Sequence, residues 1–82
     1  MKFTYDPRYN IAYIRFSEKK AEAESIRLSD EITVDIGSDG ILYGIELLNA
    51  SEQLQRDDAG DLIILNEATG HETRFSLMGR TP

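Results

Sequence analysis

The stretch ITVDIGSDGILYGIELLNA, from Ile32 to Ala50, decides the fold of this chain. It consists of two runs of alternating apolar residues joined by the tetrapeptide GSDG at residues 37–40. Side chains alternate between the two faces of a strand, so each run predicts a strand that buries one face. Glycine and aspartate accept the backbone conformations of tight turns. The stretch therefore predicts an antiparallel β-hairpin.

The exact turn of this hairpin decides which residues face each other. Asp39-Gly40 is a strong signal for a two-residue type I′ turn. That turn gives three apolar pairs on one face: Ile36 with Tyr43, Val34 with Ile45, and Ile32 with Leu47. A turn centred on Ser38-Asp39, with Gly40 in a bulge, slips the register by one residue and mixes apolar with polar positions, so we reject it. A four-residue loop keeps the faces matched and remains open.

Size, charge and cysteine content bound the class of protein. The 82 residues are expected to form one small domain, residues 1–82, of marginal stability. The chain has no cysteine, which removes disulfides and thiolate metal sites. Its net charge of −6 opposes binding to nucleic acid and to anionic membranes. With no signal-like apolar segment and no run of membrane-spanning length, a cytoplasmic location is expected.

Short strands and turns are predicted elsewhere. Strands are expected at residues 3–5, 11–16, 22–28, 62–65 and 72–78, a charged turn at residues 17–21, and a frayed tail at residues 79–82. Residues 11–16 have apolar side chains on both faces, which is typical of a central strand, whereas residues 22–28 have one wet face. Asn49 and Glu52 resemble a capping box and predict a helix of one to two turns that ends before Asp57.

The predicted fold is mainly β (α+β). It is an antiparallel β meander of about seven short strands with one short helix after the fifth strand.

Several motifs in fixed order resemble a known family. They are Tyr5-Asp6-Pro7, Ala12 to Ser17, Val34-Asp35-Ile36, Asp39-Gly40, and Gly44 to Ser51. In order and spacing they are similar to domain-of-unknown-function family 2283, a group of small bacterial proteins. The resemblance covers residues 2–52, and residues 53–78 form a helix end and a C-terminal hairpin outside it.

The resemblance implies a bacterial or phage origin and a cytoplasmic setting, and it carries no catalytic residues. Some relatives look like antitoxins because they are encoded beside small toxin-like proteins. Two positions depart from the family pattern. Asn10 stands where relatives often have Asp, and Gly37-Ser38 replaces a more acidic approach to the turn. Both changes weaken any acidic cluster that the family uses.

Candidate catalytic and metal-binding residues are few. Asp6, Asp35 and Glu46 are weak candidates for a carboxylate metal site, because oxygen ligands suit Ca²⁺ and Mg²⁺. Solubility explains these acids equally well. The single histidine, His71, is expected in a solvated turn. We expect no catalytic residues and no cofactor. A small metal- or ligand-dependent enzyme using the carboxylates is the alternative function.

One apolar feature is less easily explained as solvent-exposed surface. The outer face of the second hairpin strand is expected to carry Leu42, Gly44 and Leu48, with Glu46 between them. Either the helix or final hairpin of the same chain covers these leucines, or another chain does. We therefore expect a non-enzymatic protein–protein interaction module, homo-oligomeric or paired with a small basic toxin-like protein. Leu42, Gly44 and Leu48 are its candidate contact residues, and Asp39 and Gly40 its structural turn.

Overall fold

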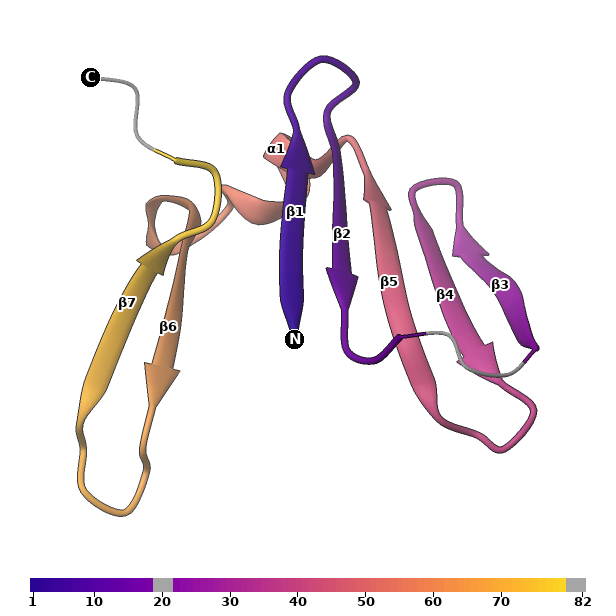
Figure 1. The fold of residues 1–82 in the computed structure, drawn as a ribbon. Coiled ribbons are helices and arrows are strands. Elements are labelled where there is room, and N and C mark those ends of the chain that lie inside the picture. Colours follow the sequence, from indigo (N-terminus) through magenta and orange to yellow (C-terminus); the bar gives the residue numbers. More distant parts are fainter. Residues whose placement is uncertain (19–21, 80–82) are drawn as a thin grey trace. The chain divides into compact units, whose positions relative to one another are not determined.

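A computed structural model describes residues 1–18 and 22–79. Its strands are β1 (Lys2–Asp6), β2 (Ile11–Arg15), β3 (Ala23–Ser29), β4 (Ile32–Gly37), β5 (Leu42–Leu48), β6 (Asp61–Leu65) and β7 (Glu72–Ser76), with helix α1 (Ala50–Leu54) and a 3₁₀ turn (Asp58–Gly60) between β5 and β6 (Figure 1). The mainly β class, the antiparallel strands and the short helix after the fifth strand are confirmed. Part of the expected charged turn (residues 19–21) and most of the expected tail (residues 80–82) lie outside the described residues.

The chain divides into two compact units, residues 1–50 and residues 51–82. The first unit contains a five-stranded antiparallel sheet in the order β1-β2-β5-β4-β3. This order departs from a simple meander, because β2 pairs with β5 and not with β3. Three consecutive strands (β3, β4 and β5) form a meander, and β2 returns beside β5, which is a Greek-key arrangement. The pattern placed β2 correctly as a central strand, and the strand with one wet face, β3, lies at the edge.

The β4–β5 turn is the one that the sequence argument rejected. Gly40 N–H donates to Gly37 O at 2.9 Å, Gly37 N–H donates to Ile41 O at 2.8 Å, and Gly40 has a φ of 84°. Ser38 and Asp39 therefore form the centre of the turn and Gly40 forms the bulge. The Oδ1 atom of Asp39 accepts the N–H of Ile41 at 3.0 Å and stabilises this turn.

The pairing register of β4 with β5 that the sequence predicts is nevertheless restored from Asp35 onward. Ile36 lies opposite Leu42 and not opposite Tyr43, but Asp35 lies opposite Gly44, so Tyr43 is an extra residue in β5. This second bulge cancels the slip that the turn introduces. The expected pairs Val34 with Ile45 and Ile32 with Leu47 are therefore confirmed, and the pair Ile36 with Tyr43 is wrong.

At one end of the first unit, two asparagines with left-handed backbone conformations link the β1–β2 loop to the end of β5. Asn10 has a φ of 56° and Asn49 a φ of 51°. Asn10 Nδ2 donates to Asn49 Oδ1 at 3.2 Å, and Ala50 N–H donates to Asn10 O at 2.9 Å. The expected helix is present, but Asn49 does not have the extended backbone of a capping residue. Its side chain instead links the end of β5 to the β1–β2 loop.

The second unit contains α1, the 3₁₀ turn and a two-stranded hairpin of β6 and β7. Leu62 lies opposite Phe75, and Ile64 lies opposite Thr73, so these residues share one face of the hairpin. Leu62, Ile64 and Phe75 are all exposed, by 39%, 52% and 51%. A two-stranded hairpin of this kind is marginally stable by itself in water.

Candidate functional site: the two faces of the first sheet

The pairing register assigns most strand side chains of the first unit to one of two faces. We call the first the apolar face; by register it carries Phe3, Tyr5, Ala12, Ile14, Glu24, Ile26, Ile32, Val34, Ile36, Leu42, Ile45 and Leu47. We call the second the polar face; it carries Lys2, Thr4, Asp6, Ile11, Tyr13, Arg15, Ala23, Ser25, Arg27, Thr33, Asp35, Gly37, Gly44, Glu46 and Leu48. Glu24 is the single charged residue among the strand positions of the apolar face.

The apolar face is not covered by a second layer within the first unit. Of its residues only Ala12 is buried. Glu24 is exposed, Ile26 is 41% exposed, and the other large side chains are half-buried. Among the residues that the structure describes, no large side chain is fully buried. A sheet normally packs its apolar face against another element, so this face is a candidate contact surface.

The polar face contains a hydrogen-bonded centre around Asp35. Asp35 is 8% exposed. Its Oδ2 atom accepts a hydrogen bond from Tyr13 Oη at 2.7 Å, and its Oδ1 atom accepts one from Ser25 Oγ at 2.6 Å. These three side chains come from β2, β3 and β4, so the carboxylate connects strands on both sides of β5. Buried carboxylates are retained where hydrogen bonds of this kind satisfy them.

Two glycines make room for aromatic rings on the polar face. A Cβ atom at Gly44 would overlap Cζ and Oη of Tyr13, so the Tyr13 ring crosses β5 directly over Gly44 to reach Asp35. A Cβ atom at Gly37 would lie 2.7 Å from Cε2 of Tyr43, so this ring lies over Gly37. Tyr43 is only 4% exposed as a result. A glycine inside a strand commonly marks such a close approach.

The same centre changes the acidity of the tyrosine. Burial, followed by the hydrogen bond and the negative charge of Asp35, raises the pKa of Tyr13 to about 12. A phenolate at this position would lose its hydration and face a carboxylate. Tyr13 is therefore a hydrogen-bond donor at neutral pH and not an activated base. The arrangement holds β2, β3 and β4 together.

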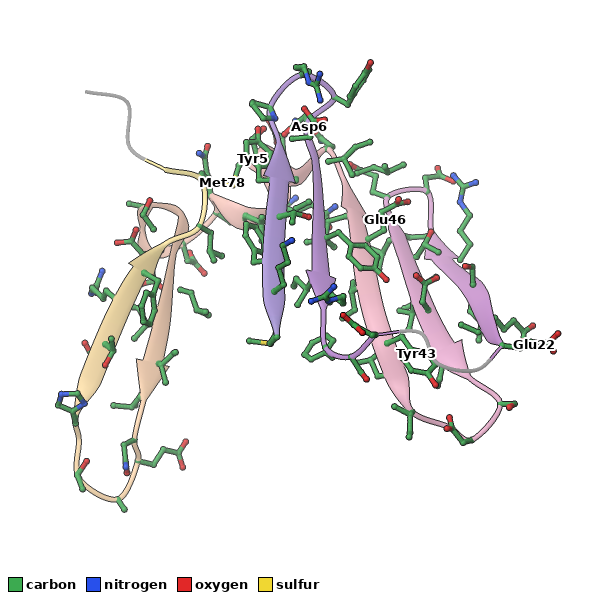
Figure 2. The ribbon with its side chains drawn as sticks, in the orientation of Figure 1. Tyr5, Asp6, Glu22, Tyr43, Glu46 and Met78 are labelled. Atoms are coloured by element: carbon green, nitrogen blue, oxygen red, sulfur yellow. The ribbon has the colours of Figure 1, made fainter. Side chains whose placement is uncertain are left out.

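The three carboxylates suggested by the sequence share the polar face but do not converge. Asp6 and Asp35 are separated by three strand spacings, about 14 Å at the usual interval between strands. Asp6 binds Arg8, with its Oδ2 atom 3.0 Å from Nη2, and this hydrogen bond holds the pKa of Asp6 below its ordinary value. Glu46 lies on β5 opposite Thr33 and Tyr13, away from Asp6 at the loop end of β1 (Figure 2). Within residues 1–18 and 22–79 no group of three His, Asp or Glu side chains is close enough to hold a metal ion.

The predicted contact residues are divided between the two faces. Gly44 and Leu48 lie on the polar face, as expected, together with Glu46. Leu42 lies opposite Ile36 on the apolar face, because the bulge at Tyr43 reverses the alternation before that residue. The expectation of one continuous outer surface is therefore wrong in its geometry. Gly44 is buried beneath Tyr13 and is not available for close approach by another chain.

Other residues are as expected or were missed. His71 is exposed in the β6–β7 connection, where its backbone N–H donates to Thr69 Oγ1 at 3.2 Å. The link between Tyr13 and Asp35 was not anticipated. Two signals pointed to it: Gly44 inside an otherwise bulky strand, and an aspartate inside a strand of alternating apolar residues.

Comparison with known proteins agrees with this sheet as a family core. The model of the family "Protein of unknown function (DUF2283)" matches residues 2–51. The chain belongs to this family. No curated protein and no solved structure matches it. The matched segment covers all five strands of the first sheet and ends inside α1, so the β6–β7 hairpin lies beyond it. No helix in the described part of the chain is long and apolar enough to cross a membrane.

Proposed function

We propose that this DUF2283 member is a protein–protein interaction module that forms a homodimer by stacking the apolar faces of two copies. The observation that carries the proposal is that the large side chains on the apolar face of the first sheet remain partly exposed to solvent. Removing that face from water would supply the association energy, at roughly 25 cal/mol for each Å² of apolar surface.

A second copy is the partner that matches this face best. Its strand positions include one charged residue, Glu24, while most of the strand acids lie on the polar face. A face with a single charged residue offers little to a basic partner, but its apolar side chains are complementary to a second copy, as a two-fold symmetric contact requires. Two such sheets would stack about 10 Å apart with their strands rotated by roughly 30°.

The size of the face supports a dimer of moderate strength. Five strands, each about five residues long, cover roughly 400 Å² in projection. Side chains that stand out from the sheet expose more than this projected area. The area buried on the two faces together therefore approaches the lower limit for specific interfaces, which is about 1,200 Å². A dimer of this size dissociates on dilution, so its population depends on the protein concentration.

A regulatory or antitoxin-like role is the sharper form of the proposal. The net charge of −6 favours a small basic partner, and most of the strand acids that would meet it lie outside the apolar face. Such a partner is compatible with the dimer, because it would use a different surface. The proposal keeps the expected cytoplasmic setting, which the cysteine-free sequence allows.

The test compares two substitutions at neighbouring positions of β1. Phe3→Glu places a charge on the apolar face, and Thr4→Glu places the same charge on the polar face. Wild type and Thr4→Glu are expected to be dimers at micromolar concentration by analytical ultracentrifugation. Phe3→Glu should raise the dimer dissociation constant by about tenfold or more, because a buried unpaired charge costs more than 1.4 kcal/mol.

Far-ultraviolet circular dichroism of the same samples separates dissociation from unfolding. A wild type that remains monomeric at high concentration would contradict the proposal. Equal dissociation by both variants would also contradict it, because the contact would then not lie on the apolar face.

A further inference from the structure

The outer edge of β3 is a second surface, formed by backbone groups and not by the side chains of the apolar face. Within the five-stranded sheet β3 pairs with β4 alone. All of its residues except Ala23 are exposed. An edge strand presents a row of backbone N–H and C=O groups that another strand can pair with.

The first part of β3 lacks two of the usual devices that block an edge, proline and lysine. From Ala23 to Arg27 the register with β4 is regular, and the sequence there contains neither Pro nor Lys. The bulge at Leu28 interrupts pairing only after that segment. The opposite edge, β1, is shorter, begins with Lys2 and is followed directly by Pro7. Lysine and proline are typical protections of an edge, so β3 is the more accessible of the two.

A hollow lies beside the start of β3. It has a volume of about 210 Å³ and is lined by Glu22, Ala23, Glu24, Ile36, Gly37 and Ser38. Glu22 lies where β3 begins, at the outer side of the sheet (Figure 2). The hollow therefore combines an apolar wall from Ile36, small residues that leave space, and two carboxylates. A long side chain with an apolar stem and a positive end has the complementary chemistry.

We propose that the Ala23–Arg27 edge binds an extended segment of another protein as an added strand, with a Lys or Arg side chain of that segment in the hollow beside Glu22 and Glu24. Main-chain hydrogen bonds supply affinity in this mode of recognition, and side-chain pockets supply specificity. The added strand would use the backbone edge of β3, which lies outside the apolar face, although Glu24 and Ile36 of the hollow belong to that face. Peptide binding and dimer mass are separate measurements, so this site is tested separately from the homodimer.

The test uses two short fluorescent peptides of alternating Thr and Val, one with a central Lys and one with a central Glu. Fluorescence anisotropy with the wild-type protein is expected to give at least about fivefold tighter binding of the Lys peptide, the upper range for a surface ion pair. Glu24→Lys should abolish this preference, because Glu22 alone remains to attract the Lys side chain. Glu67→Lys makes the same charge change in the exposed β6–β7 turn and should leave the preference unchanged.

Amide chemical shifts locate the contact. Perturbations by the Lys peptide should concentrate on Ala23 to Arg27 and on Gly37 and Ser38. Equal affinity for both peptides, absence of binding, or perturbations centred on the apolar-face residues of β1, β2 and β5 would each overturn the proposal. Because the mass of the dimer is measured independently, failure of this site leaves the proposed homodimer untouched, and a monomeric wild type leaves this site untouched.

Discussion

The polar and apolar faces of the first sheet bury their side chains by different means. On the polar face Tyr43 is 4% exposed and Asp35 is 8% exposed, although no second layer of the first unit covers them. On the apolar face Ile26 is 41% exposed and only the small Ala12 is buried. Burial in this sheet therefore does not follow hydrophobicity.

The reason lies in the shape of the side chains and their neighbours. A tyrosine ring can lie flat across a glycine and cover an adjacent carboxylate, as Tyr13 does over Gly44. Branched aliphatic side chains stand upright on a sheet, so only an opposing layer can bury their ends. Side chains of the same chain are thus enough to bury the centre of the polar face. The apolar face would be buried by a second copy in the proposed homodimer.

The largest effect that this comparison predicts is for Asp35→Ala. The change removes the acceptor of both Tyr13 Oη and Ser25 Oγ. We expect the free energy of unfolding to fall by about 3 kcal/mol, because hydrogen bonds to charged groups are among the more valuable ones. Asp30→Ala, which removes a fully exposed carboxylate, should change it by less than about 0.5 kcal/mol. Urea denaturation measures both, and equal effects would show that the polar face is not held by its carboxylate.

A smaller effect is expected for Gly44→Ala. The new Cβ atom would overlap the ring of Tyr13, and overpacking of this kind costs about 2 kcal/mol. The matched test is a double-mutant cycle with Tyr13→Ala, measured by urea denaturation. Once the ring is absent, adding the methyl group at position 44 should cost little, so the cycle should show a large coupling. Additive effects would mean that the strand, and not the ring, needs glycine there.

The pattern of the sequence predicted which residues share a face better than it predicted the local geometry. Val34 and Ile45 were paired correctly although the turn was wrong. Alternation reports only whether a position is odd or even, and the bulges at Gly40 and Tyr43 each shift it by one. Two shifts cancel beyond the second bulge, so the pattern cannot detect them. Leu42, between the two bulges, is the residue that this error misplaced.

Non-local relations were the other part that the sequence could not supply. Apolar residues on both faces correctly identified β2 as central, but they do not say which strand lies beside it. The pairing of β2 with β5 joins residues 29 to 37 positions apart, such as Ile14 with Ile45. The Asp35 centre depends on that pairing, because Tyr13 reaches Asp35 only across β5. Gly44 was predicted to contact another chain, whereas the ring of Tyr13 from the same chain lies directly over it.

The smallest effect, confined to alkaline pH, tests whether the polar face acts through the neutral tyrosine. The pKa of Tyr13 is raised from 10.0 to about 12 in the folded protein. A group whose pKa is higher when folded contributes stability that is complete below its unfolded pKa and is lost as the pH rises through its folded pKa. Between pH 10 and about 12, wild-type stability should therefore fall more steeply than that of Tyr13→Phe, which has no phenol at this position. Urea denaturation across this range, compared between the two proteins, isolates the contribution of Tyr13 from the other ionising groups. Parallel curves would mean that the hydrogen bond to Asp35 does not favour the neutral phenol, and the polar face would then depend on ring packing over Gly44 alone.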